Sequence, residues 1–394
     1  MRKVRLGEFV EILNGYAFKS KEYTNEGVRV IRITNVQKGT IIDNNPQYYP
    51  IELKSQLKRY LLSENDILMS LTGNVGRVGV LKKELMPAFL NQRVCSLRPK
   101  SDILDNKYLY HYLNTDVFEF NAIQSSAGIA QKNMSTKWLE EHEIPLPPLP
   151  EQKHIAEVLD KADALRQKNK ELLQDYNDLQ QAIFLDMFGD PVTNPKGWET
   201  KMLSEVSEVV SGVTKGRKLI GKELITLPYM RVANVQDGHL VLDEIKTIDV
   251  LHSDFEKYKL ISGDILLTEG GDPDKLGRGA VWNGEIENCI HQNHIYRVRI
   301  TCKELNEIYL STLIGSNYGK RYFLKAAKQT TGIATVNSTQ LKKFPVILAP
   351  IKIQQDFKIA TKNIEQQKEK AKESLAYSEE LFGALVQKYF GNHN

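Results

Sequence analysis

The 394-residue chain contains few cysteines and lacks any long apolar run, and both absences restrict what it can be. The three cysteines, Cys95, Cys289 and Cys302, lack the spacing of a disulfide framework, which favours a reducing cytoplasm. No apolar run reaches the roughly 18 residues of a membrane helix, and residues 1–10 lack the apolar segment of a signal peptide. We therefore expect a cytoplasmic protein without a membrane span.

Nucleotide-binding signatures are also missing. The glycine-rich run at residues 73–79 lacks the GxGxxG spacing, and no GxxxxGK[ST] sequence is present anywhere in the chain. A self-sufficient methyltransferase would need such a cofactor loop, so this enzyme alternative has little support. The net charge of +4 permits nucleic acid as a partner without arguing for it.

The sequence does contain a long stretch without proline or glycine. Residues 144–152 read Ile-Pro-Leu-Pro-Pro-Leu-Pro-Glu-Gln, and neither residue type recurs before Gly189. Apolar side chains then recur at spacings of three and four, which predicts a long helix with one narrow seam for a partner helix. The predicted seam contains Ile155, Val158, Ala162, Leu165, Leu172, Tyr176, Leu179 and Ile183. Asn169 lies on the same seam, either as a device that fixes register or as a tolerated, partly wet position.

The partner helix is predicted in the same chain. Gln354 repeats Gln152 after 202 residues, and the second seam contains Phe357, Ile364 and Leu385. The repetition extends into the preceding sequence, where residues 31–37 match 230–236 and residues 66–68 match 264–266. A period of about 200 residues is too long for a solenoid and indicates two copies of one domain plus one helix.

This repeat sets the expected domain organisation. We expect a first globular copy at residues 1–149, a helix at 150–189, a linker at 190–200, a second globular copy at 201–350 and a helix at 351–391. Each copy is expected to mix helices and strands, so the fold class is α+β. The expected strands include residues 28–33, 67–71 and 94–97, and the expected helices include residues 53–60, 106–120 and 303–325.

The order of these parts resembles a known family. The proline-rich start of the first helix, the Phe-Gly-Asp-Pro sequence at its end and the Gly-Ile-Ala turn at 128–130 are similar to the DNA-specificity subunit of type I restriction–modification enzymes. The resemblance covers essentially the whole chain, and it depends on the complete unit occurring twice rather than on any single motif. It implies two target-recognition domains that each read one half of a bipartite DNA site. It also implies that the two helices pair antiparallel as a spacer and give the chain a pseudo-two-fold repeat.

The resemblance further implies partners and an absence of catalysis. The partners would be double-stranded DNA, two methyltransferase subunits that bind S-adenosylmethionine, and endonuclease–translocase subunits. No cofactor is expected on this chain itself. The alternative is a coiled-coil scaffold whose globular copies bind protein or carbohydrate.

Candidate DNA contacts lie in loops that share a skeleton between the copies while their side chains differ. Cationic and polar residues in glycine-rich loops suit phosphates and base edges. In the first copy the candidates are Tyr16, Lys19, Arg32, Thr72, Asn74, Arg77, Gln92, Arg93, Gln131 and Lys132. In the second copy they are Lys215, Arg217, Arg231, Lys275, Arg278, Gln292, Asn293 and His294.

Each candidate has a structural alternative. The loops could be ordinary solvated turns, and the equivalent Arg32 and Arg231 could form internal ion pairs instead of holding phosphates. The sequence alignment places residues 91–94 opposite residues 291–294. Cys289, His291 and His294 contain zinc-binding side chains, but a fourth ligand at usable spacing is missing, which favours a polar strand end.

Overall fold

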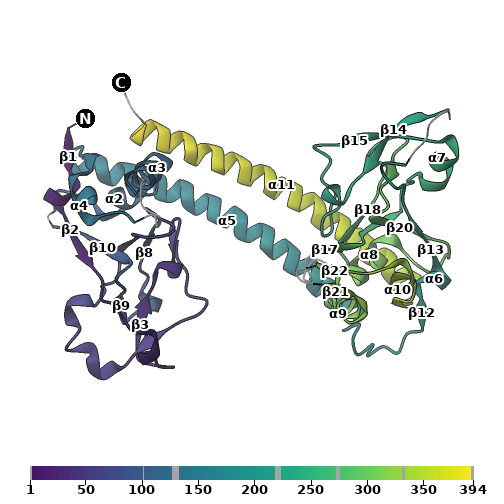
Figure 1. The fold of residues 1–394 in the computed structure, drawn as a ribbon, viewed down its shortest axis with the longest axis horizontal. Helices are drawn as coiled ribbons and strands as arrows, with labels where there is room; N and C mark the ends of the chain where they lie inside the picture. The colour runs from purple at the N-terminus through teal and green to yellow at the C-terminus, as the bar shows by residue number, and fades with distance from the viewer. Residues whose placement is uncertain are drawn as a thin grey trace. The chain divides into compact units, whose positions relative to one another are not determined.

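In the computed structural model, the described residues are 2–100, 102–126, 133–217, 223–271, 276–330 and 333–391. The chain divides into two compact units, one formed by residues 1–171 with 372–394 and the other by residues 172–371. Two 40-residue helices, α5 (Leu149–Phe188) and α11 (Ile351–Phe390), each begin in one unit and end in the other (Figure 1). Each unit therefore contains one globular copy and half of each long helix.

The two helices pair antiparallel within each unit. In the first unit, Ile155 near the start of α5 packs in the same core as Phe390 at the end of α11. In the second unit, Phe184 near the end of α5 packs against Phe357 near the start of α11, with ring centroids 5.5 Å apart. The expected helix pair is thus present in both halves of the protein.

The seam between the helices has a different phase from the predicted one. Ile155, Ala162 and Asn169 are buried as predicted, but Leu165, Leu172 and Leu179 are 46%, 38% and 46% exposed. The second seam position of each heptad lies four residues after the first, not three, and the pattern is the same in both helices. These second positions are Leu159, Arg166, Leu173 and Gln180 in α5 and Thr361, Lys368, Leu375 and Phe382 in α11.

Arg166 occupies one of these second seam positions. Arg166 lies over the ring of Phe382 at 4.4 Å, so the seam uses a long cationic side chain where the sequence pattern offers a leucine. Of the remaining predicted seam residues, Val158 and Tyr176 are half-buried, whereas Ile183 and Leu385 pack against the domain cores. The apolar residues of the pattern therefore divide between the helix seam, the domain cores and the exposed surface.

Asn169 connects the helices through hydrogen bonds in the first unit. Its Nδ2 donates to the backbone oxygen of Ser374 at 3.1 Å and to Oγ of Ser378 at 3.2 Å. Its Oδ1 accepts from Oγ of Ser374 at 3.3 Å. Asn169 is 7% exposed and Ser378 is 2% exposed, so a shift of register would bury these polar groups without partners. This geometry favours the register-fixing role.

The two larger sheets of the first copy have four and three strands (Figure 1). An antiparallel four-stranded sheet has the order β2 (Val10–Asn14), β10 (Val94–Pro99), β7 (Ile67–Ser70), β8 (Val78–Val80). A three-stranded sheet has the order β6 (Tyr48–Tyr49), β3 (Val28–Ile31), β9 (Ala88–Leu90), in which β3 and β9 are parallel. The helices α2 (Asn106–Leu113) and α3 (Asp116–Ser125) follow these sheets in the chain.

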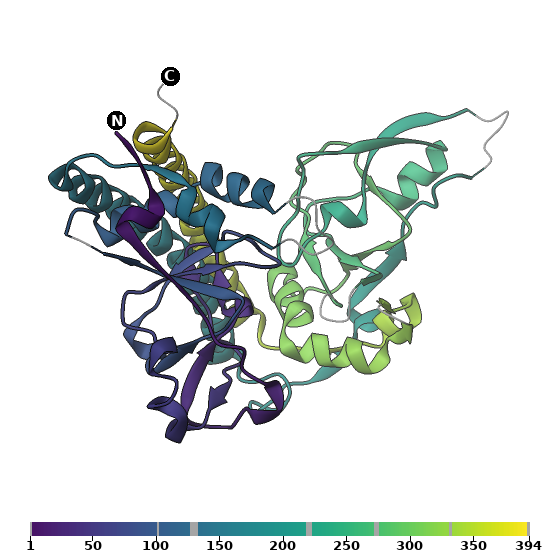
Figure 2. The same ribbon diagram turned by 60° about the vertical axis from the view of Figure 1, so that its left-hand side comes forward.

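The second copy repeats this arrangement. Its four-stranded sheet has the order β13 (Ser207–Ser211), β20 (Ile295–Ile300), β16 (Ile265–Thr268), β18 (Gly279–Val281). Its three-stranded sheet has the order β15 (Lys246–Val250), β14 (Ile225–Met230), β19 (Ile290–His291), and the corresponding pair β14 and β19 is parallel. The helices α8 (Glu307–Gly315) and α9 (Asn317–Ala326) follow (Figure 2). The internal repeat and the mixed α and β content are confirmed.

Short elements complete each copy. A two-stranded sheet of β1 (Lys3–Arg5) and β11 (Glu143–Pro145) lies just before α5, and β12 (Thr200–Met202) pairs with β23 (Pro345–Ile347) just before α11. The other short strands are β4 (Val36–Gln37), β5 (Thr40–Ile41), β17 (Gly270–Gly271), β21 (Lys328–Thr330) and β22 (Ile333–Thr335). The other short helices are α1 (Leu6–Phe9), α4 (Thr136–Glu141), α6 (Leu203–Val206), α7 (His252–Tyr258) and α10 (Ser338–Lys342).

Four predicted elements differ from the structure. Residues 53–60 form two short 3-10 turns (Ile51–Lys54 and Lys58–Tyr60) and not one helix. The helical stretches predicted at 106–120 and 303–325 each divide into two helices, because Thr115 caps α3 and Ser316 ends α8. The strand predicted at 28–33 ends at Ile31, where a 3-10 turn (Ile33–Asn35) begins.

Each long helix has a buried glutamine in its first turn, Gln152 in α5 and Gln354 in α11. Nε2 of Gln152 donates to the backbone oxygens of Ile103 and Pro147 at 2.9 and 2.8 Å. Its Oε1 accepts from the backbone N–H of Asp105 at 2.8 Å. Gln354 makes the three equivalent bonds in the second copy, and both glutamines are completely buried. Each long helix is thereby attached to the loop that precedes α2 or α8.

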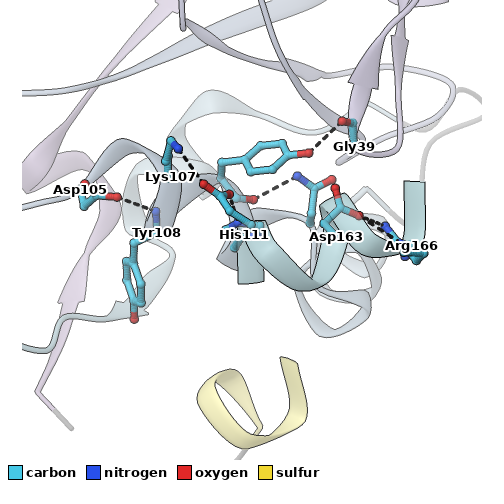
Figure 3. Close-up of polar contacts among 10 residues, drawn as sticks. Gly39, Asp105, Lys107, Tyr108, His111, Asp163 and Arg166 are labelled. Atoms are coloured by element: carbon cyan, nitrogen blue, oxygen red, sulfur yellow. Dashed lines mark hydrogen bonds and ion pairs between the residues drawn. The ribbon is translucent and has the colours of Figure 1, made fainter. Parts of the chain in front are cut away.

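In the first unit, a polar cluster adds a second attachment between α5 and α2 (Figure 3). Asp160 of α5 accepts from Nζ of Lys107 at 2.6 Å and contacts Nε2 of His111 at 2.7 Å. The hydroxyl of Tyr110 donates to the backbone oxygen of Gly39 at 2.8 Å. Burial lowers the pKa of His111 despite the neighbouring carboxylate.

No helix in the described part of the chain is long and apolar enough to cross a membrane.

Candidate nucleic-acid interface

Backbone hydrogen bonds bring three predicted loops of the first copy to one edge. The N–H of Tyr16 donates to Leu90 O at 2.8 Å, and the N–H of Gln92 donates back to Tyr16 O at 2.9 Å. The N–H of Leu71 donates to Arg93 O at 3.0 Å. The loop after β2, the loop after β7 and the turn before β10 therefore meet at one place, which we call the reading edge.

The second copy has the same reading edge. The N–H of Val213 donates to His291 O at 2.8 Å, and the N–H of Asn293 donates to Val213 O at 2.9 Å. The N–H of Glu269 donates to His294 O at 3.0 Å. The backbone that presents these loops is thus kept between the copies.

These bonds correct the sequence alignment of the turn by one residue. Gln92 and Asn293 make the same bond to the neighbouring loop, and Arg93 and His294 make the same bond to the strand that follows β7 or β16. Gln92 is therefore equivalent to Asn293, and Arg93 to His294. The sequence alone misaligns residues 91–94 with 291–294 because this turn is polar in both copies. One residue more before the turn leaves the apolar pattern of the following strand unchanged.

A glycine is required where the first loop begins. A Cβ placed on Gly15 would lie 2.2 Å from the backbone of Asn91, and one on Gly212 would lie 2.0 Å from the backbone oxygen of His291. Neither site has room for a side chain, so the backbones cross in direct contact. This contact explains the glycine at the start of both loops.

Several candidate side chains at the reading edge are exposed to solvent. In the first copy Lys19, Asn74, Gln92 and Arg93 are exposed, whereas Tyr16 and Thr72 are half-buried. In the second copy Lys215, Arg217 and His294 are exposed, whereas Gln292 and Asn293 are half-buried. Tyr16 packs against Phe18 and Tyr60, with ring centroids 5.0 and 5.2 Å apart.

Other candidate cations have internal partners. Nη1 of Arg77 donates to Oε1 of Gln37 at 2.8 Å, and Arg278 makes the equivalent bond to Gln236 at 2.9 Å. The shared Asn-Val-Gln sequence could have suggested these two glutamines, but their role as arginine partners was not predicted. The glutamines hold the second loop against the preceding hairpin.

Arg217 is held by α7. Its Nη2 lies 2.6 Å from Oδ2 of Asp254, and the guanidinium holds the pKa of that carboxyl below its usual range. Arg217 thus orders the loop it belongs to, which is a role that the sequence did not indicate.

Arg32 and Arg231 both donate hydrogen bonds to backbone oxygens of their own copy. Nη2 of Arg32 donates to the backbone oxygen of Asn45 at 2.7 Å. Nη2 of Arg231 donates to the backbone oxygen of Glu244 at 2.8 Å and lies 3.2 Å from its carboxylate. Each arginine therefore contacts the equivalent loop of its own copy, 13 residues further along the chain, and the contact of Arg231 is the ion pair that the structural alternative expects.

In the first copy the loop after β4 forms an ion pair with α3, and in the second copy the loop after the 3-10 turn Val232–Asn234 forms a pair of reversed charge with α9. Nζ of Lys38 lies 2.7 Å from Oε2 of Glu119 on α3. In the second copy, Nζ of Lys320 on α9 lies 3.3 Å from Oδ2 of Asp237. The pair gives Lys320 a partner within the protein.

The possible zinc ligands do not meet. Cys289 and His291 are buried, and Nδ1 of His291 donates to the backbone oxygen of Ile295 at 3.0 Å. His294 is exposed and pairs with Glu269. No group of three His, Cys, Asp or Glu side chains within the described residues could hold a metal ion. Burial lowers the pKa of His291 to about 3 and raises that of Cys289 to about 12.

Three candidates, Gln131, Lys132 and Lys275, lie outside the described residues, as does the turn at 128–130. The sequence reasoning also missed Glu269, which lies at the reading edge of the second copy. Its acidic charge does not indicate a DNA contact, because carboxylates are repelled by phosphates.

Comparison with known proteins identifies the family. The profile of the type I restriction modification DNA specificity domain matches residues 1–174 and again residues 195–373. The chain belongs to this family of type I DNA specificity proteins. The two matches correspond to the two copies of the internal repeat.

Individual relatives agree with this assignment. The specificity subunit of the type I restriction enzyme EcoBI from Escherichia coli is 24% identical over 381 residues, covering 90% of this chain and 77% of that one. The StySPI specificity subunit from Salmonella potsdam is 24% identical over 369 residues, covering 87% and 77%. A crystal structure of the S subunit from M. genitalium has a similar fold, with a TM-score of 0.58, 16% identity and coverage of 100% and 96%.

The family assignment fixes the general role. This chain is a DNA-recognition subunit without catalytic activity of its own, and the scaffold alternative is not favoured. Specificity subunits of type I complexes bind DNA and assemble with subunits that methylate and restrict it. The reading edge is therefore the candidate site for the DNA-recognition function.

Proposed function

We propose that each globular copy reads one half of a bipartite, asymmetric DNA site through its reading edge. The observation that carries this proposal is the pair of reading edges with one backbone and different side chains. Gln92 and Arg93 stand where the second copy has Asn293 and His294. Two copies that read the same sequence would need the same side chains at equivalent positions, so the difference supports two unlike half-sites.

Different side chains would make different kinds of contact. The exposed Lys19 and Lys215 suit phosphates, whose recognition does not depend on sequence. Lys19 also has an exposed ion-pair partner, since its Nζ lies 3.4 Å from Oε1 of Glu22. Gln92, Arg93 and Asn293 suit base edges in the major groove, since amide and guanidinium groups can make paired hydrogen bonds there. Arg77, Arg278, Arg32 and Arg231 would mainly order the loops, because their guanidinium groups already have internal partners.

The long helices would serve as spacer and docking surface. We propose that residues 150–189 and 351–391 set the number of unread base pairs, and that residues 1–149 and 201–350, joined by the linker at 190–200, are the recognition domains. The exposed Leu165, Leu172 and Leu179 recur every seven residues along α5 and support a docking role, since exposed apolar rows often mark interfaces. Two methylation subunits that carry S-adenosylmethionine would bind there, joined by restriction subunits, in the cytoplasm.

The test is methylome sequencing of a host that expresses this chain together with its methylation subunits. We expect one gapped, asymmetric motif that is absent when the methylation subunits are expressed alone. Exchanging residues 200–345 for those of a relative should change one half of the motif and leave the other half unchanged. An equivalent exchange within residues 1–145 is the matched control and should change the opposite half. A motif that changes in both halves, or in neither, would refute the assignment of one copy to each half.

A further inference from the structure

One acidic side chain lies at the reading edge of the second copy. Glu269 directly follows β16, and its backbone bond to His294 makes it equivalent to Leu71 of the first copy. Leu71 is buried, whereas the side chain of Glu269 is 31% exposed. The first copy therefore has an apolar residue where the second copy presents a carboxylate.

The position and orientation of Glu269 are well defined. Its backbone N–H donates to His294 O at 3.0 Å, and its backbone oxygen accepts from Val336 N–H at 2.9 Å. Its Oε2 lies 2.7 Å from Nδ1 of His294, and its Oε1 accepts from the hydroxyl of Tyr296 at 3.3 Å. An ionised carboxylate offers about four acceptor sites, so two donors leave acceptor capacity available. The carboxylate is held in place without being saturated.

A carboxylate at a DNA-facing edge is selective for chemical reasons. It is repelled by phosphates, and it can only accept hydrogen bonds. In the major groove the hydrogen-bond donors are the N4 amino group of cytosine and the N6 amino group of adenine. Carboxylates pair with the cytosine amino group, whereas adenine is better matched by the amide of Asn or Gln, which donates and accepts at once.

We propose that Glu269 reads a cytosine in the second half-site through its N4 amino group, with His294 and Tyr296 as positioning residues. The inference rests on the proposed function, because it needs this edge to face DNA. The first copy has Leu71, Arg93 and Cys95 at the three equivalent positions. The requirement for this carboxylate contact is therefore confined to the half-site read by the second copy.

The test compares methylomes of hosts that express the methylation subunits with the wild-type chain or with Glu269→Gln. Glutamine keeps the shape but replaces one acceptor oxygen with an amide donor. We expect one C·G pair in the second half of the motif to become degenerate, with discrimination at that pair falling about 5- to 150-fold. Glu304→Gln is the matched control, since Glu304 is an exposed acid of the same copy whose carboxylate lies 3.9 Å from Lys201. It should leave the motif unchanged.

A second measurement protects the test against loss of folding. If Glu269→Gln abolishes methylation, binding of the purified complex to duplexes with and without the C·G pair decides the question, because the ratio of affinities is independent of the active fraction. For His294→Ala we expect the same motif with less complete methylation, because His294 orients the carboxylate of Glu269 and does not itself read the base.

The outcomes separate the inference from the proposed function. If the wild-type chain gives no bipartite motif, the proposed function fails. The inference alone is overturned if the wild-type second half contains no C·G pair, or if Glu269→Gln leaves every position unchanged. It is likewise overturned if the relaxed position is an A·T pair or lies in the first half.

Discussion

Replacing the buried Gln354 by leucine should loosen the second copy from its helix. The side chain makes three hydrogen bonds, to the backbone N–H of Asn306 at 2.8 Å, to Glu304 O at 2.9 Å and to Ala349 O at 2.6 Å. Leucine has a similar volume but makes none of them. The three backbone groups would lose the partner that this completely buried side chain provides.

The size of the effect follows from these lost bonds. A buried polar group without a partner costs about 1–3 kcal/mol, and three such groups, one of them only partly buried, give about 3–6 kcal/mol. This is a large part of the roughly 5–15 kcal/mol that stabilises a typical domain. The neighbouring Gln355 is exposed, so Gln355→Leu is a control with the same chemical change and an expected effect of about 0.5 kcal/mol or less.

Hydrogen exchange measured by mass spectrometry is the suitable assay, because a protein with two units need not unfold in one step. In Gln354→Leu, exchange in the segment that contains α8 should accelerate by about 100-fold or more, since about 1.4 kcal/mol corresponds to tenfold. The segment that contains α2 should keep its wild-type protection. Equal effects of Gln354→Leu and Gln355→Leu, or a change below tenfold at α8, would show that the three bonds do not hold the domain to the helix.

Three further predictions concern charged groups. Lys38→Asp should lower the free energy of unfolding by about 1 kcal/mol at most. Adding Glu119→Lys should restore most of this loss, because the second copy uses the reversed pair. Urea titration of the single and double variants measures both effects. Burial lowers the pKa of His291 to about 3, so below pH 6.5 the unfolded chain binds a proton at this residue that the folded chain does not bind. The contribution of His291 to stability should therefore be complete above pH 6.5, and the free energy of unfolding should fall by up to about 1.4 kcal/mol per pH unit below it. Urea midpoints at pH 7 and pH 5 should therefore differ less in His291→Gln than in the wild type, and equal differences would contradict the assignment. Lys19→Ala and Lys215→Ala should each reduce the slope of log affinity against log salt by about 0.9 in the assembled complex, with equal weakening on all sequences; a change restricted to one sequence would instead indicate base contacts.

The sequence by itself determined the architecture. The repeated Gln152 and Gln354, the match of residues 31–37 to 230–236 and the long interval without proline or glycine before Gly189 were sufficient to predict two copies of one domain and two paired helices. These features are readable because each depends on local chemistry. Proline and glycine limit helices wherever they occur, and a residue needed for one buried contact recurs when that contact is duplicated.

The helix seam shows where the sequence was insufficient. A heptad pattern with leucine at Leu165, Leu172 and Leu179 predicts that these side chains face the partner helix, yet they are exposed. An isolated helix cannot show whether the second seam position falls three or four residues after the first. The choice depends on the partner helix and on Asn169, whose hydrogen bonds to Ser374 and Ser378 require a particular rotation.

The recognition site was decided by tertiary structure for a similar reason. The sequence placed Arg77, Arg217 and Arg231 among exposed cations, but only the fold brings Gln37, Asp254 and Glu244 to them. Partners that lie 13 to 40 residues apart in the chain leave no periodic signal. The sequence alone therefore indicated two equivalent sets of candidate loops. Which side chains remain available there for DNA was decided by contacts between segments that only the folded chain brings together.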